Sequence, residues 1–391
     1  MNYFKESLKL HKQLKGKIEV VSRISNLDQE MFSLAYTPGV AEPCREIQKD
    51  VNKSFELTRR SNTVAVVTDG TAILGLGDIG PEAGMPVLEG KALIFKTFAD
   101  IDAIPLCIRS KDSEEIIRTI ELLAGSFGGV NLEDISAPRC FEIERQLKER
   151  CEIPIFHDDQ HGTAIVVGAA LINALKLVTK EIDKIRVVIN GAGSAGIAIA
   201  NYLMKLGVVD ILMCDRFGII SEGMKELNSA QTEISKKTNH NHKKGILKDA
   251  LVDADVFIGV SIGNVVTQEM IKLMADKPIV FPLANPIPEI SREDALEAGA
   301  AIVGTGRSDF PNQINNALVF PGVFRGALDV RAKDINDEMM LAAGYAIANF
   351  IDSDELRSDY IIPNALNKDL HQAIAKAVSE AAIKSQVSQV K

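Results

Sequence analysis

Two acidic doublets, Glu133-Asp134 and Asp158-Asp159, are the residues of this sequence best suited to chemistry. Each follows a short apolar run, and carboxylates that lie close enough to repel one another are stabilised by a divalent cation. Oxygen ligands favour Mg²⁺ or Mn²⁺ over Zn²⁺, which prefers imidazole and thiolate. His157 and His161 flank the second doublet, but no cysteine stands at a spacing typical of a zinc site. The alternative is a set of solvated surface carboxylates; two doublets at predicted strand ends favour the metal site.

A glycine-rich turn, Gly191-Ala192-Gly193-Ser194-Ala195-Gly196, separates an expected strand at 185–190 from an expected helix at 197–206. It matches the GxGxxG pattern, in which glycines permit a tight turn and a close approach to a pyrophosphate at a helix N-terminus. Asp215 ends the next strand, where a carboxylate can bond the ribose hydroxyls and favour NAD. Arg216, directly after it, is the residue type that binds a 2′-phosphate, so NADP stays open. The candidate dinucleotide-binding residues are Gly191, Gly193, Ser194, Ala195, Gly196 and Asp215.

Two further residues carry protons that chemistry could use. Lys91 enters an apolar segment. It is either a surface lysine with a buried stem or an amine whose pKa is lowered by burial and a nearby cation. The lowered pKa would make the amine a base. Tyr36, two residues before Pro38-Gly39, is either a packed aromatic residue or a proton donor. The residues by themselves leave both alternatives open.

The elements that must position these groups alternate between strand and helix. This alternation predicts an α/β fold with a mostly parallel sheet, whose ligands bind at the carboxyl ends of strands. The chain is expected to be mostly helical up to residue 62, with a break at 36–39, and helical again after 322. Further helices are expected at 112–123 and, deeply buried, at 163–178; the loop at 235–245 is expected to be solvated. The expected strands span 63–68, 104–108, 129–132, 153–156, 185–190, 209–214, 256–260, 279–281 and 301–303.

A chain of 391 residues is long enough for about two domains. We expect an N-terminal α/β substrate and metal domain at 1–157 and a doubly wound, Rossmann-type dinucleotide-binding domain at 158–315. A C-terminal helical segment at 316–391 is expected to pack back on both.

The composition is that of an ordinary globular enzyme, with 46% hydrophobic and 25% charged residues. No apolar run reaches the ~20 residues that a membrane-spanning helix needs, and residues 1–20 lack the apolar stretch of a signal peptide. Five scattered cysteines, never in a CxxC pair, argue against a disulfide framework. A net charge of −9 argues against nucleic-acid and anionic-membrane partners. The sequence therefore predicts a cytoplasmic protein.

Taken together, these motifs resemble malic enzyme, the oxidative decarboxylase of malate, in its short microbial form. The resemblance covers nearly the whole chain, and its motifs are long and in order. The matching strings are YTPGVA at 36–41, VTDG at 67–70, LGLGD at 74–78, EGK at 89–91, NLED at 131–134, DDQHGT at 158–163, ANP at 284–286, TGRSD at 305–309, NN at 315–316 and FPGV at 320–323.

The resemblance implies a role for each matching residue. Lys91 matches the general base, which also contacts the substrate, and Tyr36 matches the general acid. Asp158 matches a neighbour that supports the charge state of the lysine. The residues that match the metal ligands are Glu133, Asp134 and Asp159, and those that match the substrate-holding residues are Asn285 and Asn316.

The resemblance also implies the reaction and the assembly. The reaction is the metal-dependent oxidation of (S)-malate to pyruvate and CO₂ with NAD(P), with decarboxylation of oxaloacetate as a side activity, and the expected assembly is a homodimer. Ala72 departs from the longer members of the family, which carry there an arginine that grips a substrate carboxylate. The alternatives are malolactic enzyme, which converts malate to lactate, a nucleotide-binding sensor of the same fold, and an amino-acid dehydrogenase.

Overall fold

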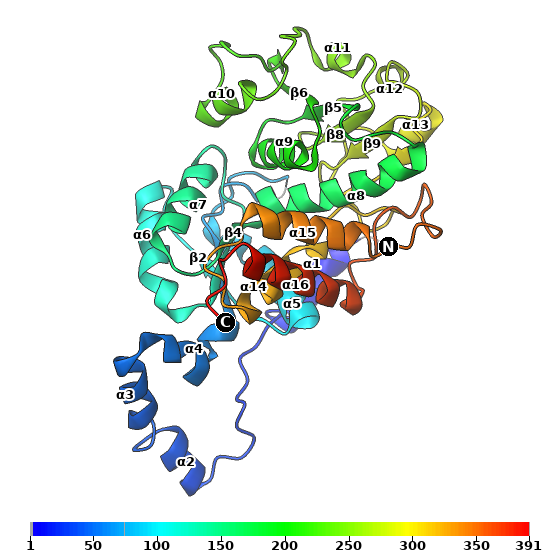
Figure 1. Cartoon of the computed structure of the whole chain (residues 1–391). Helices are drawn as coiled ribbons and strands as arrows, with labels where there is room; N and C mark the ends of the chain where they lie inside the picture. Colours follow the sequence, from blue (N-terminus) through cyan, green and yellow to red (C-terminus); the bar gives the residue numbers. More distant parts are fainter. Residues whose placement is uncertain (1–2, 74, 391) are drawn as a thin grey trace.

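The computed structural model describes residues 3–73 and 75–390 (Figure 1). It is an α/β structure, as predicted, and its described residues form two sheets that are parallel except at one edge. Leu74, part of one of the strings that resemble malic enzyme, lies outside the described residues.

The first sheet lies in the N-terminal part of the chain. Its strands are β1 (Thr63–Thr68), β2 (Asp102–Cys107), β3 (Gly129–Leu132) and β4 (Ile155–His157), in the order β2-β1-β3-β4, all parallel. Side chains alternate between its faces, so Val64 and Val66 pack under α5 (Pro81–Ala99), while Ala65 and Val67 pack under α6 (Ser113–Leu123) and α7 (Arg139–Arg150). Leu132 is the register partner of His157, so the residues that follow β3 and β4 emerge side by side.

The second sheet has the order β10-β9-β8-β5-β6-β7. Its central strand β5 lies between β6 and β8, the strand arrangement at which doubly wound sheets open a crevice for a ligand. The short β7 is antiparallel to β6. The strands are β5 (Arg186–Asn190), β6 (Asp210–Asp215), β7 (Gly218–Ile219), β8 (Val256–Gly259), β9 (Ile279–Pro282) and β10 (Ile302–Val303).

Helices cover both faces of this sheet. On one face, β5 packs through Val187 and Ile189 against α8 (Thr163–Val178) and α9 (Ser194–Leu206). On the other, Val188 joins a smaller core formed with the short helices of that side. The short helices of this half are α10 (Ser229–Ser235), α11 (Leu247–Leu251), α12 (Gln268–Ile271) and α13 (Arg292–Glu297).

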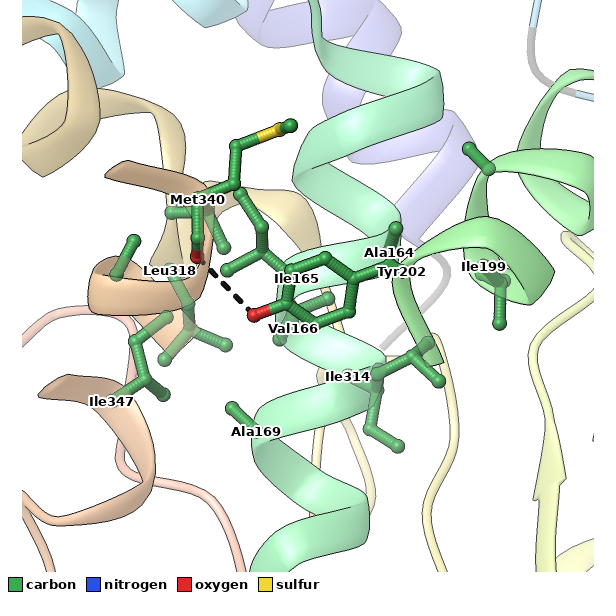
Figure 2. Close-up of a cluster of buried hydrophobic side chains, with 14 of the residues drawn as sticks. Ala164, Ile165, Val166, Ala169, Ile199, Tyr202, Ile314, Leu318, Met340 and Ile347 are labelled. Atoms are coloured by element: carbon green, nitrogen blue, oxygen red, sulfur yellow. Dashed lines mark hydrogen bonds between the residues drawn. The ribbon is translucent and has the colours of Figure 1, made fainter. Parts of the chain in front are cut away.

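Helix α8 is the buried centre of the molecule, as its apolar sequence predicts. Tyr202 of α9 lies between α8 and α15 (Asp337–Ala348), and its hydroxyl donates to the Met340 carbonyl at 3.2 Å (Figure 2). Only glycine fits against its ring, because a Cβ on Gly168 or Gly344 would lie 2.4 or 2.1 Å from atoms of Tyr202. Three helices therefore share one close-packed contact.

By length and composition alone, the continuous helix Asp158–Val178 could cross a membrane, although the sequence indicated no such run. In the fold, 72% of its apolar window is buried inside the protein, which accounts for its hydropathy.

The C-terminal helices return to the first sheet. In α14 (Phe320–Asp329), the rings of Phe320 and Phe324 lie 4.7 and 5.3 Å from the ring of Phe95 in α5. Helix α16 (Lys368–Lys384) packs on α14 and α15. The helices after 316 therefore contact both α5 and α8. The division of the chain at 157 and 315, with the C-terminal segment that follows it, stays a prediction.

The N-terminal part departs most from a compact fold. Helix α1 (Tyr3–Leu14) is followed by an irregular stretch, then by α2 (Gln29–Ala35), α3 (Ala41–Lys49) and α4 (Ser54–Leu57). Residues 18–50, which we call the N-terminal arm, contain no buried residue. Figure 1 shows α2 and α3 lying away from both sheets. Residues 15–28 are not helical, so the expectation of a mostly helical start holds only in part.

Two other local expectations need correction. Helix α5 begins at Pro81, so Lys91 lies in the middle of a long helix and not at the start of an apolar segment. The loop at 235–245 is only partly solvated, because Thr238 and Asn239 are buried and the Asn239 side chain donates to the carbonyls of Ile220 and Lys243.

Candidate active site

Three carboxylates meet at the carboxyl ends of β3 and β4. Glu133, Asp134 and Asp159 each offer an oxygen within 4.8 Å of the others. The backbone N–H of Asp134 donates to Asp159 Oδ2 at 2.7 Å, which joins the two strand ends directly. Asp134 adopts a left-handed φ of 55°, a conformation that non-glycine residues adopt rarely and that is common at functional sites. The structure thus brings the two doublets, expected at strand ends, together at one sheet edge; their role as metal ligands stays a prediction.

The cluster suits a hard divalent cation. Glu133 is 3% exposed, and burial together with the Asp159 carboxylate raises its pKa well above the usual range, although Lys91 opposes the shift. Crowded, buried carboxylates of this kind lose their mutual repulsion when a cation binds between them. An all-oxygen donor set fits Mg²⁺ or Mn²⁺.

Lys91 projects from α5 into the same edge and is only 8% exposed. Its ammonium group pairs with Asp158 Oδ2 and lies 3.1 Å from Glu133 Oε1. It also donates to Asn316 Oδ1 at 3.2 Å, from η5 (Asn316–Leu318), and lies 4.5 Å above the ring of Phe320. The structure therefore brings four residues proposed from the sequence into contact: Lys91, Asp158, Glu133 and Asn316. Lys91 and Asn316 are 225 positions apart in the chain.

The charges around Lys91 decide its protonation. Burial would lower the pKa of Lys91, but the carboxylates of Asp158, Glu133 and Asp159 outweigh burial and raise this pKa. Burial raises the pKa of Asp158 to about 6, against the effect of Lys91. The protein's own groups thus hold Lys91 as an ammonium, and the neutral amine requires compensation of the surrounding negative charge.

A short π-helical turn, η4 (Asp158–Gly162), sets the position of Asp158 and leads into α8. Gly162 ends this turn with φ −61°, and a Cβ on it would lie 1.8 Å from Asp158 Oδ1. The absence of a side chain at 162 therefore makes room for the carboxylate that pairs with Lys91.

A second pair fixes the turn from outside. His161 Nε2 lies 2.8 and 2.9 Å from the two carboxylate oxygens of Glu144 in α7. Although burial opposes it, the ring of His161 lowers the pKa of Glu144 to about 2. Sequence reasoning left His161 out of the metal ligands and missed Glu144, because a glutamate in a strongly charged helix carries no distinguishing pattern.

The glycine-rich turn has the shape that a pyrophosphate needs. Gly191 has φ +115°, and a Cβ on it would lie 2.5 Å from the Val260 carbonyl; on Gly196 it would lie 1.8 Å from the Gly191 carbonyl. Gly193, the N-cap of α9, has nothing within 4 Å of its Cβ position, so its backbone borders open space. Ser194 and Ala195 open the helix, whose free N–H groups favour an anion at this point.

Asp215, at the end of β6, is held from two sides. Its Oδ1 accepts from the Arg216 backbone and its Oδ2 accepts from Gln231 Nε2, both at 2.5 Å. Gln231 also donates to the carbonyl of Ala192 in the glycine-rich turn at 3.3 Å, a link that the sequence did not reveal. The Arg216 guanidinium lies over the Phe217 ring at 4.7 Å.

Two candidate residues lie elsewhere. Tyr36 is 62% exposed on the N-terminal arm, where its ring contacts Phe32 at 5.8 Å, and the chain does not bring it to Lys91. Asn285, just after β9, is exposed, and its amide donates to the Leu283 carbonyl at 3.3 Å.

The comparison with known families agrees with this geometry. Residues 15–113 match the N-terminal domain of malic enzyme, and residues 160–383 match the NAD-binding domain of malic enzyme. The chain belongs to the malic enzyme family. These two domains correspond to the halves that carry Lys91 and the glycine-rich turn.

Curated malic enzymes are similar over almost the full chain. The bifunctional malic/malolactic enzyme of Bacillus subtilis is 56% identical over 391 residues, which cover 100% of this chain and 95% of that protein. The NAD-dependent malic enzyme of Geobacillus stearothermophilus is 53% identical, with 95% of this chain and 78% of that protein covered.

Solved malic enzymes share the fold. The NAD-dependent malic enzyme of Thermotoga maritima has a TM-score of 0.92 at 50% identity and covers 95% of this chain and 98% of its own. The malic enzyme of Pyrococcus horikoshii has a TM-score of 0.95 at 46% identity and covers 99% and 92%.

Proposed function

We propose that this chain catalyses the oxidative decarboxylation of (S)-malate to pyruvate and CO₂ with reduction of NAD, with NADP as the alternative coenzyme, and that it decarboxylates oxaloacetate as a side activity. The observation that carries this proposal is the buried contact of Lys91 with Asp158 and Glu133, beside the cluster of oxygen ligands. Membership of the malic enzyme family supports it.

Glu133, Asp134 and Asp159 would hold Mg²⁺ or Mn²⁺. When bound, the cation supplies Lewis-acid polarisation of substrate oxygens and the nicotinamide supplies the hydride acceptor. Both Mg²⁺ and Mn²⁺ take oxygen ligands, so the donor set leaves the choice between them to availability.

Lys91 is the proposed general base. It accepts the proton of the C2 hydroxyl as hydride leaves C2, returns a proton to the same oxygen after CO₂ has left, and takes this proton back as C3 is protonated, which leaves the ketone of pyruvate. Asp158, buried against it, favours the ammonium and so makes Lys91 a good proton acceptor once the other negative charges are compensated. Asn316, already within 3.2 Å of Lys91, and Asn285 would orient the substrate.

Tyr36 is the proposed general acid, which protonates C3 after decarboxylation. Because Tyr36 is exposed on an arm without buried residues, we propose that it serves the cleft of a second copy in a homodimer. In a two-fold dimer each copy can extend its arm to the other, so both sites are completed at once. The arm's apolar side chains, such as Val20 at 95% exposure, support a protein partner there.

The test of the reaction is a spectrophotometric assay of NADH formation with malate and Mn²⁺, with each coenzyme in turn and with pyruvate measured at the end. Equal amounts of NADH and pyruvate are expected. Binding of NAD without any turnover would favour a nucleotide-binding sensor, and ammonia-dependent reduction of a 2-oxo acid would favour an amino-acid dehydrogenase.

The shared site is tested by mixing two inactive variants, Tyr36→Phe and Lys91→Ala, under conditions that exchange subunits. About half of the dimers become mixed and each carries one intact site, so about a quarter of the wild-type activity should return. A control mixture of Lys91→Ala with Asp159→Asn should stay inactive, because both residues belong to the same cleft. If the first mixture also stays inactive, Tyr36 does not act across the dimer.

Malolactic activity is a second candidate, because the Bacillus subtilis relative is a bifunctional malic/malolactic enzyme. This reaction yields lactate and CO₂ without net NADH. Lactate formed in excess of NADH would establish it. We also propose a cytoplasmic location, supported by five cysteines that are all free.

A further inference from the structure

One buried carboxylate, Glu289, has no part in the proposed chemistry. It is fully buried and follows β9 after a short loop. Its Oε1 accepts from the Ser261 backbone at 2.8 Å and from the Ser261 hydroxyl at 3.2 Å, and its Oε2 accepts from the Ala284 backbone at 3.1 Å. Gly259, the last residue of β8, makes room for it, because a Cβ there would lie 2.3 Å from the carboxyl carbon of Glu289.

The hydrogen bonds of Glu289, together with one from Asn190 to Ser261, join three neighbouring strand ends. Asn190, the last residue of β5, donates from Nδ2 to the Ser261 hydroxyl at 2.8 Å, and Gly191 of the dinucleotide turn follows it directly. Ser261 comes after β8, and Ala284 comes after β9. Strands β5, β8 and β9 are adjacent in the sheet, so this network crosses the carboxyl edge from the glycine-rich turn to the loop that carries Asn285.

The Asn285 loop has close neighbours on both sides. A Cβ on Gly75, from the N-terminal half, would lie 2.4 Å from the Asn285 carbonyl oxygen. A Cβ on Gly306 would lie 2.7 Å from Asn285 Nδ2. The position of the Asn285 amide is therefore set by the backbone around it, and Glu289 holds the near end of that backbone.

We propose that Glu289 is a positioning residue that couples occupancy of the dinucleotide turn to the binding of malate by Asn285, through Ser261 and Asn190. This inference rests on the proposed function, in which Asn285 holds the substrate. A bound dinucleotide contacts the turn next to Asn190, and the network fixes Asn285 relative to that turn. Malate binding is then tighter when the coenzyme is present.

The test is calorimetry of malate binding to the Mn²⁺-loaded protein, with and without saturating NADH. In the wild type, NADH should tighten malate binding about fivefold or more. In Glu289→Gln the amide oxygen keeps the two Ser261 donors, while its NH₂ group faces the Ala284 N–H and cannot accept from it. In this variant the ratio of the malate dissociation constant without NADH to that with NADH should fall towards unity. The NADH dissociation constant should stay within about twofold of wild type.

Ser261→Ala is an independent test, because it removes only the hydroxyl that links Asn190 to Glu289. This variant should also abolish the coupling. Glu293→Gln makes the same chemical change at an exposed site on α13 and should leave the coupling intact. Wild-type coupling that persists in Ser261→Ala and Glu289→Gln, or a wild type without coupling, would overturn the proposal. Malate turnover of the wild type is scored separately, so a failure of the proposed function is seen on its own.

Discussion

Gly162→Ala tests whether the position of Asp158 controls turnover. The backbone of Gly162, at φ −61° and ψ −45°, accepts alanine without strain. The main effect of the substitution is therefore the contact of the new Cβ with the Asp158 side chain. The new Cβ would lie 1.8 Å from Asp158 Oδ1, whereas ordinary contacts begin at 3.4 Å. The carboxylate must therefore move by about 1.6 Å, and its other oxygen, which pairs with Lys91, moves with it.

A misplacement of about 1 Å in a catalytic group can cost about 10² in rate, so we expect kcat/KM for malate to fall about 100-fold or more. The melting temperature should change little, because replacing glycine by alanine in a helix itself stabilises by about 0.4–1 kcal/mol. The assay is steady-state NADH formation with saturating coenzyme and Mn²⁺, together with thermal unfolding.

The matched control is Gly125→Ala, where nothing lies within 4 Å of the added Cβ; it should behave as wild type. A second control adds Gly162→Ala to Asp158→Ala. Without the carboxylate only the milder approach to the Asn316 Cβ, at 3.0 Å, remains, so the second substitution should cost far less than it does alone, a strong departure from additivity. Near-normal turnover of Gly162→Ala, or full additivity in the double variant, would refute the reasoning.

Three further outcomes are expected. Lys91→Ala should lower kcat by ~10²–10⁴ with NAD binding nearly intact, and unchanged turnover would exclude it as the base. Because burial and Asp159 raise the pKa of Glu133, protons compete with the cation for this carboxylate, and the rise in melting temperature caused by Mn²⁺ should shrink as the pH falls through the range in which Glu133 becomes protonated. Asp159→Asn should shrink this rise at every pH. An Asp159→Asn variant with the wild-type response to Mn²⁺ would contradict the ligand assignment. NAD should be preferred over NADP in kcat/KM because Asp215 repels a 2′-phosphate, and a strong preference for NADP would show that Arg216 governs the pocket instead.

Local sequence patterns predicted the elements in which the intrinsic preference of the residues matches the structure that they form. Strands β1 and β3 and helix α8 have the predicted bounds, because β-branched runs and a long apolar segment each favour one structure. The start of α5 was missed because Gly84, Pro86 and Gly90 all disfavour a helix interior. Tertiary packing decides there: a Cβ on Gly84 would lie 2.9 Å from Ile73 and 3.1 Å from Thr68.

The candidate site was predictable in part. The doublets lie together because β3 and β4 are adjacent and in register, as consecutive strands of an alternating α/β chain usually are. The contact of Lys91 with Asn316 joins residues 225 positions apart, which spacing could not predict; the resemblance to a family only assigned both residues to substrate. The exposure of Tyr36 could not be predicted, because a motif specifies residue types and not how its segment packs.

The turn that carries Asp158 and Asp159 is continuous with α8, and α8 is clamped to α9 by the fit of Tyr202 against Gly168. Gly168 lies about 9 Å along the helix axis from Gly162. One continuous helix therefore begins at the acidic groups and packs on α9, whose first turn is the proposed coenzyme site. Substitutions that enlarge residue 168 should disturb catalysis together with folding, although they touch neither reactant.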